Sequence, residues 1–404
     1  MSIECDVLVV GGGPAGSSAA RAASIQGAKT ILVEKQKIIT NVPCAEGIGS
    51  YLFPFLPFKI PKDQLIWNIN GILFSDGETQ IIQKNHFYKA WSINRGKFDN
   101  FLLQMAKKNG SKIMMNSELT DLKMFDNKKV NKAYITNDKK QIIIEPEIII
   151  AADGVESTVA KKLGLIKETE DSIGHVVSWE MKNVDNIYPH LEQMFFGNFA
   201  PRAYAYVFPK SKNTANIGVG STKGDENLDK YFEIFTNEII KNQVKNAVKT
   251  INRSGKAPIK KRIDNIRYKN IIFTGDSANQ NFKPYEEGIL PSIICGDIAG
   301  NIAAKKDISR YEKIVNKKFK NQFNQSNKII KKMYSIDKID DKKRDLIMMY
   351  LYAFMETEEI DKLSKKNVEE IKEILFKKSR HVNSFITMFL YLLWYFKVLA
   401  TRCD

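Results

Sequence analysis

A cysteine at position 44 stands in the segment Pro43-Cys44-Ala45-Glu46-Gly47, shortly after a glycine-rich loop. A thiol has an ordinary pKa of about 8.5, and apolar surroundings raise that pKa. Cys44 would therefore stay protonated at neutral pH, with a proton available for chemistry. A free cysteine is also commonly a small buried core residue. The segments around Cys44 decide between these two interpretations.

The loop before this cysteine, residues 11–16 (GGGPAG), satisfies the pattern G-x-G-x-x-G. It follows an apolar run at 5–10 and precedes a predicted helix at 17–26, and a second predicted strand at 30–33 ends at Glu34. Glycines allow a tight turn and a close approach of backbone to a pyrophosphate, whose charge a helix N-terminus favours. A carboxylate about 20 residues after the loop can accept hydrogen bonds from a ribose. Together these features predict a dinucleotide-binding unit.

The chain after this unit alternates between strand and helix patterns. Residues 50–94 contain three prolines, which exclude a long helix and favour short strands and turns. The expected elements that follow are a helix over 94–110, alternating strands up to 143 and a buried strand over 148–154. This order is typical of a doubly wound sheet whose strands end in turns at one edge.

Residues 165–262 show alternating apolar patterns, which predict an antiparallel sheet interrupted by one helix at about 228–251. A buried strand at 271–276 and a helix at 290–304 return to the first unit. From 305 onward the chain is expected to be helical and basic.

The predicted fold class is α/β: a Rossmann-like nucleotide-binding domain, an antiparallel-sheet substrate domain and a helical C-terminal region. The expected boundaries are 1–50, 95–164 and 265–304 for the first, 51–94 and 165–264 for the second, and 305–404 for the third.

The composition is that of an ordinary globular protein, with 43% hydrophobic and 27% charged residues in a chain of 404. The formal net charge of +16 favours an anionic partner, either a membrane surface or an acidic redox protein. A generally lysine-rich composition would explain the same charge. We expect no nucleic-acid partner, because the lysines are interleaved with acids and no nucleic-acid motif is present.

The four cysteines lack the pair spacing of a zinc or iron–sulfur site, so we expect no metal and no disulfide framework. The first strand begins almost at the first residue, which we interpret as the absence of a signal peptide and hence a cytosolic location.

A run of apolar and aromatic residues at 384–396 follows a basic segment near the C-terminus. It is shorter than the ~20 residues that span a bilayer. Two interpretations stay open: a helix that lies in the membrane surface, giving peripheral contact, or a terminal helix packed on the substrate domain.

Four segments together resemble the geranylgeranyl reductase family of flavoproteins. The first is the loop 11–16 with Glu34, and the second is the segment 43–47, which is similar to the family's Cys-Gly-Glu-Gly segment beside the flavin ring. The third is residues 201–209 (PRAYAYVFP), similar to the family's P-x-x-Y-x-W-x-F-P. The fourth is residues 275–289, similar to the second flavin-binding segment, with Gly275-Asp276, Pro284 and Gly288-Ile289. The second and third segments are particular to this family, whereas the first and fourth are shared widely among flavoproteins.

The resemblance implies FAD as the cofactor and an isoprenoid lipid as the substrate. The cofactor-binding residues that it implies are Gly11, Gly13, Ala15, Gly16, Glu34, Cys44, Ala45, Gly47, Arg95, Asp276, Gly288 and Ile289. The substrate-binding residues that it implies are Tyr204, Tyr206, Phe208 and Pro209, of which 204, 206 and 208 would share one face of a strand. Because no second dinucleotide pattern is present, we do not expect a nicotinamide bound in the conventional Rossmann manner. The basic net charge agrees instead with an acidic, ferredoxin-like electron donor.

The predicted function is FAD-dependent reduction of geranylgeranyl double bonds in membrane lipids or their precursors. Hydride addition alone would leave an unstabilised carbanion, so a proton must reach the other alkene carbon. Cys44 is the expected catalytic residue. It would donate or relay that proton, or position the flavin and the alkene for hydride transfer.

The chain departs from the family at Tyr285-Glu286-Glu287, where glycine-rich sequence is usual. Two carboxylates at the electron-rich edge of a flavin would oppose its anionic reduced form, unless they point to solvent. Two other functions stay open, the first because it shares the loop 11–16 and the 275–289 segment, the second because of Glu286 and Glu287. One is a flavin monooxygenase on an aromatic or polyprenyl substrate, which needs neither Cys44 nor the 201–209 segment. The other is a lipid-binding protein without turnover.

Overall fold

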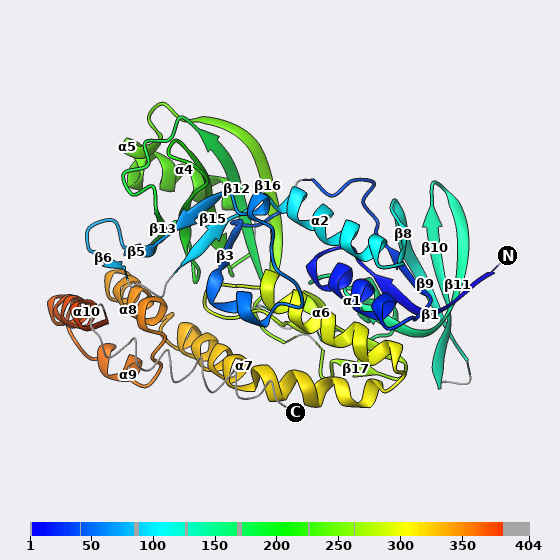
Figure 1. Ribbon diagram of the computed structural model, residues 1–404. Coiled ribbons are helices and arrows are strands. Elements are labelled where there is room, and N and C mark those ends of the chain that lie inside the picture. Colours follow the sequence, from blue (N-terminus) through cyan, green and yellow to red (C-terminus); the bar gives the residue numbers. More distant parts are fainter. Residues whose placement is uncertain are drawn as a thin grey trace.

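A computed structural model describes residues 2–40, 42–84, 89–125, 128–167, 172–224, 227–261 and 263–382. The predicted apolar helix at 384–396 and Cys403 lie outside the described residues. Figure 1 shows the arrangement: one sheet with its helices, a second sheet beside it, and the C-terminal helices running along both.

The first sheet carries the glycine-rich loop at the carboxyl end of a central strand. β1 (Ser2–Val10) lies between β11 (Lys140–Ala151) and β2 (Thr30–Val33) and is parallel to both. The sheet order is β17-β18-β11-β1-β2-β8, and β10 and β9 extend it from β11 as antiparallel strands. The other strands are β8 (Lys112–Met114), β9 (Ser117–Phe125), β10 (Lys129–Asn137), β17 (Arg267–Tyr268) and β18 (Ile271–Phe273). The predicted parallel arrangement at the loop is therefore confirmed.

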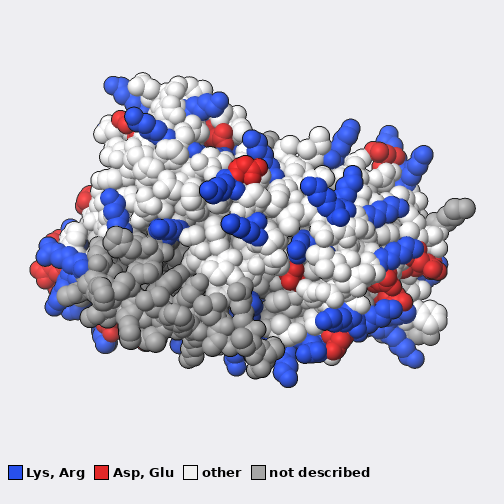
Figure 2. Space-filling model, in the orientation of Figure 1, with Lys and Arg blue, Asp and Glu red and all other residues white. Residues whose placement is uncertain are grey.

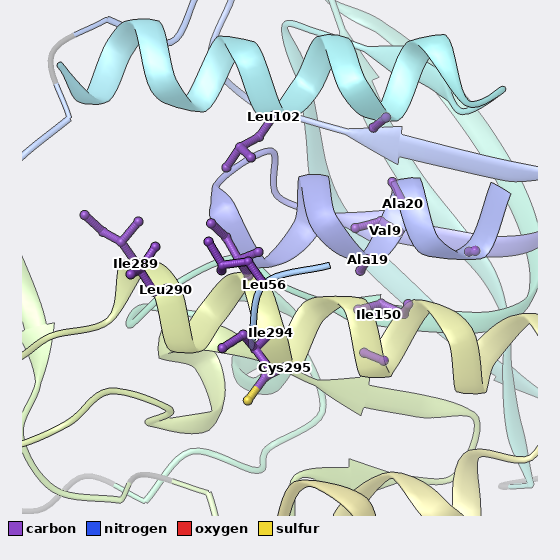
Figure 3. Close-up of a cluster of buried hydrophobic side chains, with 14 of the residues drawn as sticks. Val9, Ala19, Ala20, Leu56, Leu102, Ile150, Ile289, Leu290, Ile294 and Cys295 are labelled. Atoms are coloured by element: carbon purple, nitrogen blue, oxygen red, sulfur yellow. The ribbon is translucent and has the colours of Figure 1, made fainter. Parts of the chain in front are cut away.

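Three helices cover one face of this sheet: α1 (Pro14–Ile25), α2 (Arg95–Lys108) and α6 (Ile289–Ala304). Side chains from all three meet strand residues such as Val9 and Ile150 in a buried cluster (Figure 3). The short helix α3 (Thr158–Lys162) packs on the opposite face with β9 and β10.

Glycines allow α1 and α6 to approach each other closely. A Cβ atom on Gly296 would lie 2.1 Å from the carbonyl oxygen of Ala15, and one on Gly300 would lie 2.1 Å from that of Ala19. No side chain fits at either position, so the two backbones are in direct contact. This contact places the N-terminus of α6 beside the glycine-rich loop.

The second sheet has the order β16-β12-β15-β14-β13-β5-β6. Its strands are β5 (Gly71–Ser75), β6 (Gln80–Gln83), β12 (Ile173–Lys182), β13 (Leu191–Phe195), β14 (Ala205–Pro209), β15 (Thr214–Ser221) and β16 (Val248–Pro258). The expected antiparallel pairing holds throughout except between β13 and β5, which are parallel.

The helix predicted over 228–251 ends earlier than expected. It consists of α4 (Leu228–Ile234), a π-helical turn (Phe235–Ile239) and α5 (Lys241–Val244). Residues 248–251 instead begin β16, which pairs with β12 along its whole length. Pairing with an existing sheet edge outweighs the weak helical preference of this short segment.

A small sheet supports the cysteine segment. β3 (Gly47–Gly49) and β4 (Trp67–Ile69) both pair with β7 (Ala90–Ser92). A 3-10 helix (Ser50–Phe55) follows β3, and a second one (Lys62–Gln64) precedes β4. The expectation of short strands and turns between 50 and 94, without a long helix, is confirmed in the described part of that segment.

The C-terminal region is helical, as predicted, as far as the structure describes it. Its helices are α7 (Tyr311–Ser335), α8 (Asp341–Phe354), α9 (Ile360–Leu363) and α10 (Val368–Val382). α7 starts beneath α6, and α8 and α10 lie at the edge of the second sheet formed by β5 and β6 (Figure 1). Among the described residues, no helix is long and apolar enough to cross a membrane.

Candidate active site

A cavity of about 880 Å³ lies where the two sheets and the C-terminal helices meet. The nucleotide-binding unit contributes Pro14, Arg95, Asp276, Gly288 and Ile289 to its wall. The second sheet and the helices α7 and α8 contribute mainly apolar and aromatic side chains, among them Ile72, Met194, Tyr204, Met333 and Tyr352. A cavity of this volume is large enough for a sizeable organic ligand.

The glycine-rich loop leaves open space on its outer side. A Cβ atom on Gly13 would meet no protein atom within 4 Å. In contrast, a Cβ on Gly16 would lie 1.9 Å from the carbonyl oxygen of Gly11, and Gly11 itself has a left-handed φ of 102°. Gly11 and Gly16 therefore shape the turn, whereas Gly13 faces the room that a pyrophosphate needs.

Glu34 holds the loop in place through backbone amides. One carboxylate oxygen accepts a hydrogen bond from the Gly12 N–H at 2.7 Å, and the other accepts one from the Gln36 N–H at 2.8 Å. Each oxygen keeps a second lone pair that a ribose hydroxyl can use. Ala15 is buried below the loop and contacts Gly296 of α6.

The cysteine segment is fixed by three hydrogen bonds. The Glu46 N–H donates to Cys44 Sγ at 3.2 Å, and Asn216 Nδ2 donates to the Cys44 carbonyl oxygen at 2.7 Å. The Ile93 N–H donates to the Glu46 carbonyl oxygen at 2.8 Å. Glu46 has a left-handed φ of 65°, so the chain turns sharply after Cys44, which is half-buried and lines the cavity.

Glu46 is completely buried within a network of four charged side chains. Lys210 Nζ lies 2.6 Å from Glu46 and 2.6 Å from Glu180, while Arg253 lies 3.7 Å and 3.6 Å from the same two carboxylates. Burial alone would raise the pKa of Glu180, but Lys210 and Arg253 lower it below its usual value. Two anions and two cations thus neutralise each other behind the cysteine segment.

Arg95 lies at the start of α2 and lines the cavity beside Cys44. Its guanidinium donates two hydrogen bonds of 2.9 Å to Asp99, one turn along the helix. The backbone N–H of Arg95 donates to Glu46 Oε1 at 2.9 Å. Burial acts to lower the pKa of Arg95, but Asp99 and Cys44 together raise it. Arg95 is therefore a fixed positive charge at the cavity wall.

Aromatic side chains of the 201–209 segment lie on one face of β14 and line the cavity. The ring centroids of Tyr204 and Tyr206 are 6.1 Å apart, and those of Tyr206 and Phe208 are 4.9 Å apart. Gly218 on β15 makes room for Tyr206, because a Cβ there would lie 2.4 Å from its ring. Pro209 ends the strand outside the cavity wall, where its carbonyl oxygen accepts a hydrogen bond from Ser92.

Gly288 and Ile289 form the N-terminus of the 16-residue helix α6 at the cavity wall. The free backbone amides of such a terminus favour negative charge in front of them. Asp276 lies beside Gly288, and a Cβ there would be 3.4 Å from its carboxylate. Burial raises the pKa of Asp276, while Lys283 and Arg95 act to lower it.

Both carboxylates of the unusual 285–287 segment line the cavity and do not simply face solvent. Glu287 accepts hydrogen bonds from the Gly49 N–H and from the hydroxyl of Tyr51. Burial raises its pKa to about 6, although those two hydrogen bonds act to lower it. Glu286 faces the buried Lys283, with a shortest nitrogen–oxygen distance of 3.9 Å.

The structure brings most of the predicted site residues together around one cavity. The predicted residues that line it are Cys44, Ala45, Gly47, Arg95, Tyr204, Tyr206, Phe208, Asp276, Gly288 and Ile289. The predicted residues that do not line it are Gly11, Gly13, Ala15, Gly16, Glu34 and Pro209. Within the described part of the chain, no cluster of three or more potential ligands could hold a metal ion.

Sequence reasoning missed several groups at this site. The charge network was not foreseen, although Glu46 stands in the quoted cysteine segment and Lys210 follows Pro209 directly. The wall formed by α7 and α8 was also missed, including Tyr352, whose ring centroid is 5.4 Å from that of Tyr204. His175 on β12 also lines the cavity, although no motif in the sequence marks it.

Comparisons with known proteins agree with this geometry. Residues 4–278 match a family model described as FAD binding domain. The digeranylgeranylglycerophospholipid reductase of Methanococcus vannielii is 33% identical over 76% of this chain and 78% of its own length. The protein of the same name from Methanococcus aeolicus is 33% identical over 75% of this chain and 77% of its own length. A crystal structure of a geranylgeranyl bacteriochlorophyll reductase-like protein from Thermoplasma acidophilum is 25% identical, with a TM-score of 0.80 over 93% of this chain and all of the other.

The fold, the cavity and the matching family model define an FAD-dependent oxidoreductase. Within that class, the chain belongs to the geranylgeranyl reductase family, together with the digeranylgeranylglycerophospholipid reductases. The predicted α/β fold, the resemblance and the FAD cofactor are thereby confirmed.

Proposed function

We propose that this protein saturates the isoprenoid double bonds of geranylgeranyl lipids, or of their precursors, with FAD as the cofactor. The observation that carries the proposal is one continuous cavity. Its wall joins Arg95, Asp276 and the α6 N-terminus to Cys44 and to the aromatic face of β14. The names of the related reductases support the same substrate class.

The residues around the glycine-rich loop suit FAD. The open side of Gly13 and the N-terminus of α1 suit its pyrophosphate, and the spare lone pairs of Glu34 suit a ribose. The amides of Gly288 and Ile289 suit the ring edge that becomes negative on reduction. When bound and reduced, FAD supplies the hydride for the alkene.

The apolar part of the cavity suits a long isoprenoid chain. Tyr204, Tyr206 and Phe208 form a continuous aromatic surface along β14, and Met333 and Tyr352 face it from the C-terminal helices. Such a surface binds a flat hydrocarbon through burial of apolar area and excludes water from it.

Cys44 is the residue that we propose to act at the reacting carbons. It lines the cavity between the Arg95 side of the wall and the aromatic face, and its segment is held rigidly by Asn216 and by the charge network. A thiol so placed can carry a proton or fix the alkene in the orientation that hydride transfer requires.

We propose an acidic, ferredoxin-like protein as the electron donor. We also propose that the protein binds its lipid substrate at the cytoplasmic membrane surface. The net charge of +16 supports both, since it attracts anionic partners. Figure 2 shows lysine and arginine side chains spread over the described part of one face, with acidic side chains among them. A donor held by such charges would reduce the protein more slowly as salt increases.

The test is mass spectrometry of a geranylgeranyl phospholipid after anaerobic incubation with the FAD-loaded, dithionite-reduced protein. The proposal predicts stepwise mass gains of one hydrogen pair per double bond. In air, a gain of one oxygen atom with consumption of dioxygen would establish a monooxygenase instead. A bound lipid of unchanged mass would indicate a binding protein without turnover.

A further inference from the structure

The turn 282–287 brings a carboxyl group into the apolar cavity. Backbone hydrogen bonds of 3.0 and 3.1 Å join Phe282 and Glu287 in both directions and close the turn. Between them Glu286 has a left-handed φ of 51°. Glycine adopts this conformation without strain, whereas a side chain is uncommon there. The backbone is thus held in a costly conformation at the point where it places a carboxyl in the cavity wall.

The turn is anchored on both sides. The hydroxyl of Tyr204, just before β14, donates to the Tyr285 carbonyl oxygen at 3.1 Å. The hydroxyl of Tyr285 donates to the Tyr352 carbonyl oxygen on α8 at 2.5 Å. The position of Glu286 is therefore fixed relative to the aromatic face of β14 and to the C-terminal helices.

Lys283 is the charge partner of Glu286, and it is almost entirely buried, with 2% of its side chain exposed against 20% for Glu286. The Lys283 ammonium also donates to the carbonyl oxygen of Pro258 and to Asn281 Oδ1, the latter at 2.6 Å. Glu286 accepts no hydrogen bond from any residue in the described ranges. Its carboxyl is therefore free to face a ligand, with a held cation behind it.

Each saturated double bond consumes one proton inside this cavity. Cys44 and Glu286 are two cavity-lining groups that could deliver it. Cys44 Sγ already accepts the Glu46 N–H at 3.2 Å, and Asn216 holds the Cys44 carbonyl oxygen at 2.7 Å, so this fixed thiol suits a positioning role. Around Glu286, burial raises the carboxyl pKa to about 7, so that the protonated acid exists at neutral pH.

We propose that Glu286 donates the proton that completes alkene saturation, with Lys283 as its charge partner. The inference rests on the proposed function and assigns the proton to one residue, which leaves Cys44 the positioning role. The alkene π bond breaks, one carbon has received the hydride, and the other forms a C–H bond with the proton of the Glu286 carboxyl. The two electrons arrive with the hydride, so Glu286 changes charge but not oxidation state. Its carboxylate is left beside the Lys283 ammonium, and water returns the proton.

Several titratable groups face Glu286 and Lys283 and bear on the pH dependence of this step. Tyr204, just before β14, and Tyr352 from α8 interact with the Glu286 charge. Burial raises the pKa of both phenols far above neutrality, so neither titrates with Glu286. Asp276 interacts with Lys283, whose pKa burial lowers to about 8. Burial raises the pKa of Tyr285, and the charges of Glu192 on β13 and of Glu287 raise it further.

The acid form of Glu286 is lost as pH rises through about 7, so the rate of proton delivery falls above that pH.

The experiment compares wild type with Glu286→Gln and with the exposed-surface control Glu358→Gln, whose side chain is 71% exposed. Each FAD-loaded protein is reduced anaerobically and mixed with a geranylgeranyl phospholipid, and the rate of lipid saturation is measured from pH 5 to about pH 9. FAD content and the flavin absorbance spectrum are recorded for each variant. We expect Glu286→Gln to bind FAD normally, to saturate lipid at least about 10²-fold more slowly, and to lose the decline in rate above neutrality. Glu358→Gln should match wild type.

A second variant keeps the test decisive if Glu286→Gln loses FAD. Lys283→Gln removes the cation that stabilises the Glu286 carboxylate, so the decline in rate should move to higher pH. A Glu286→Gln protein with wild-type rate and pH profile, or a Lys283→Gln protein with an unmoved decline, would overturn the assignment. If wild type leaves the lipid unchanged, the proposed function has failed, and that result is distinct from a defect confined to the variants.

Discussion

Lys210 Nζ lies 2.6 Å from the Glu46 carboxylate and thereby ties the end of the aromatic strand β14 to the segment that carries Cys44. The two residues are separated by 164 positions in sequence, and both are almost completely buried. The aromatic segment 201–209 and the cysteine segment are therefore joined through a buried ion pair.

Replacing Lys210 should destabilise the protein more than an ordinary surface substitution. Lys210→Met leaves Glu46 and Glu180 buried with less compensation, and breaking such a pair costs about 3–5 kcal/mol of the free energy of unfolding. Lys212→Met, at an exposed position two residues away, should change it by less than about 0.5 kcal/mol. Urea denaturation measures both, and equal midpoints for the two variants would contradict the role of the network.

Substitutions at two glycines of the loop should have different effects, one on cofactor binding and the other on folding. Gly13→Val places a side chain in the open space in front of the loop, so it should weaken FAD binding at least about tenfold without lowering the melting temperature of the apoprotein. Gly16→Val meets the Gly11 carbonyl oxygen and should destabilise the fold itself. FAD titration and thermal unfolding of the apoproteins distinguish the two effects. A destabilised Gly13→Val apoprotein would show that the space is not free.

Cys44→Ala should retain FAD but saturate lipid about 10²-fold more slowly, because misplacing a reactant lowers the rate of the chemical step by a factor of that order. If Glu286 supplies the proton, the variant keeps the decline in rate above neutral pH. Single-turnover lipid reduction at several pH values measures both properties. A Cys44→Ala protein with the wild-type rate would remove Cys44 from the reaction.

The raised pKa of Glu287 predicts a pH-dependent contribution to stability. The folded-state pKa of about 6 exceeds the ordinary value of 4.5. The folded state therefore favours the protonated carboxyl, and this stabilisation is present below about pH 4.5 and is lost as pH rises through 6. The shift corresponds to about 2 kcal/mol.

Glu287→Gln removes this titration. The free energy of unfolding of the variant, measured against wild type in urea, should improve by roughly 2 kcal/mol between pH 4 and pH 7. A difference that is constant over that range would show that Glu287 does not titrate as the structure indicates.

Local sequence patterns were sufficient to predict the nucleotide-binding unit. The strand at 30–33, the helix that ends at Ala304 and the turn at Gly11 were correct because each depends on nearby residues: apolar runs, proline and glycine. The end of the helix predicted over 228–251 was wrong because β16 forms by pairing with β12, some 70 residues earlier in the chain. No local pattern encodes that pairing.

The candidate site shows the same limit. The residues that the quoted motifs contain mostly line one cavity, but the groups that hold them come from distant segments. Glu46, Glu180, Lys210 and Arg253 are ordinary charged residues in sequence and become a buried network only when β12, β14 and β16 come together. The turn that carries Glu286 is likewise held by hydrogen bonds from Tyr204 and to Tyr352, which come from two distant segments of the chain.

The most direct measurement of the central claim is an anaerobic titration of the reduced, FAD-loaded protein with a geranylgeranyl phospholipid, followed by flavin absorbance and by the mass of the lipid. The account predicts that one flavin is reoxidised for each double bond that is saturated, without dioxygen. A flavin that stays reduced in the presence of bound lipid, and is reoxidised only when air is admitted, would contradict it.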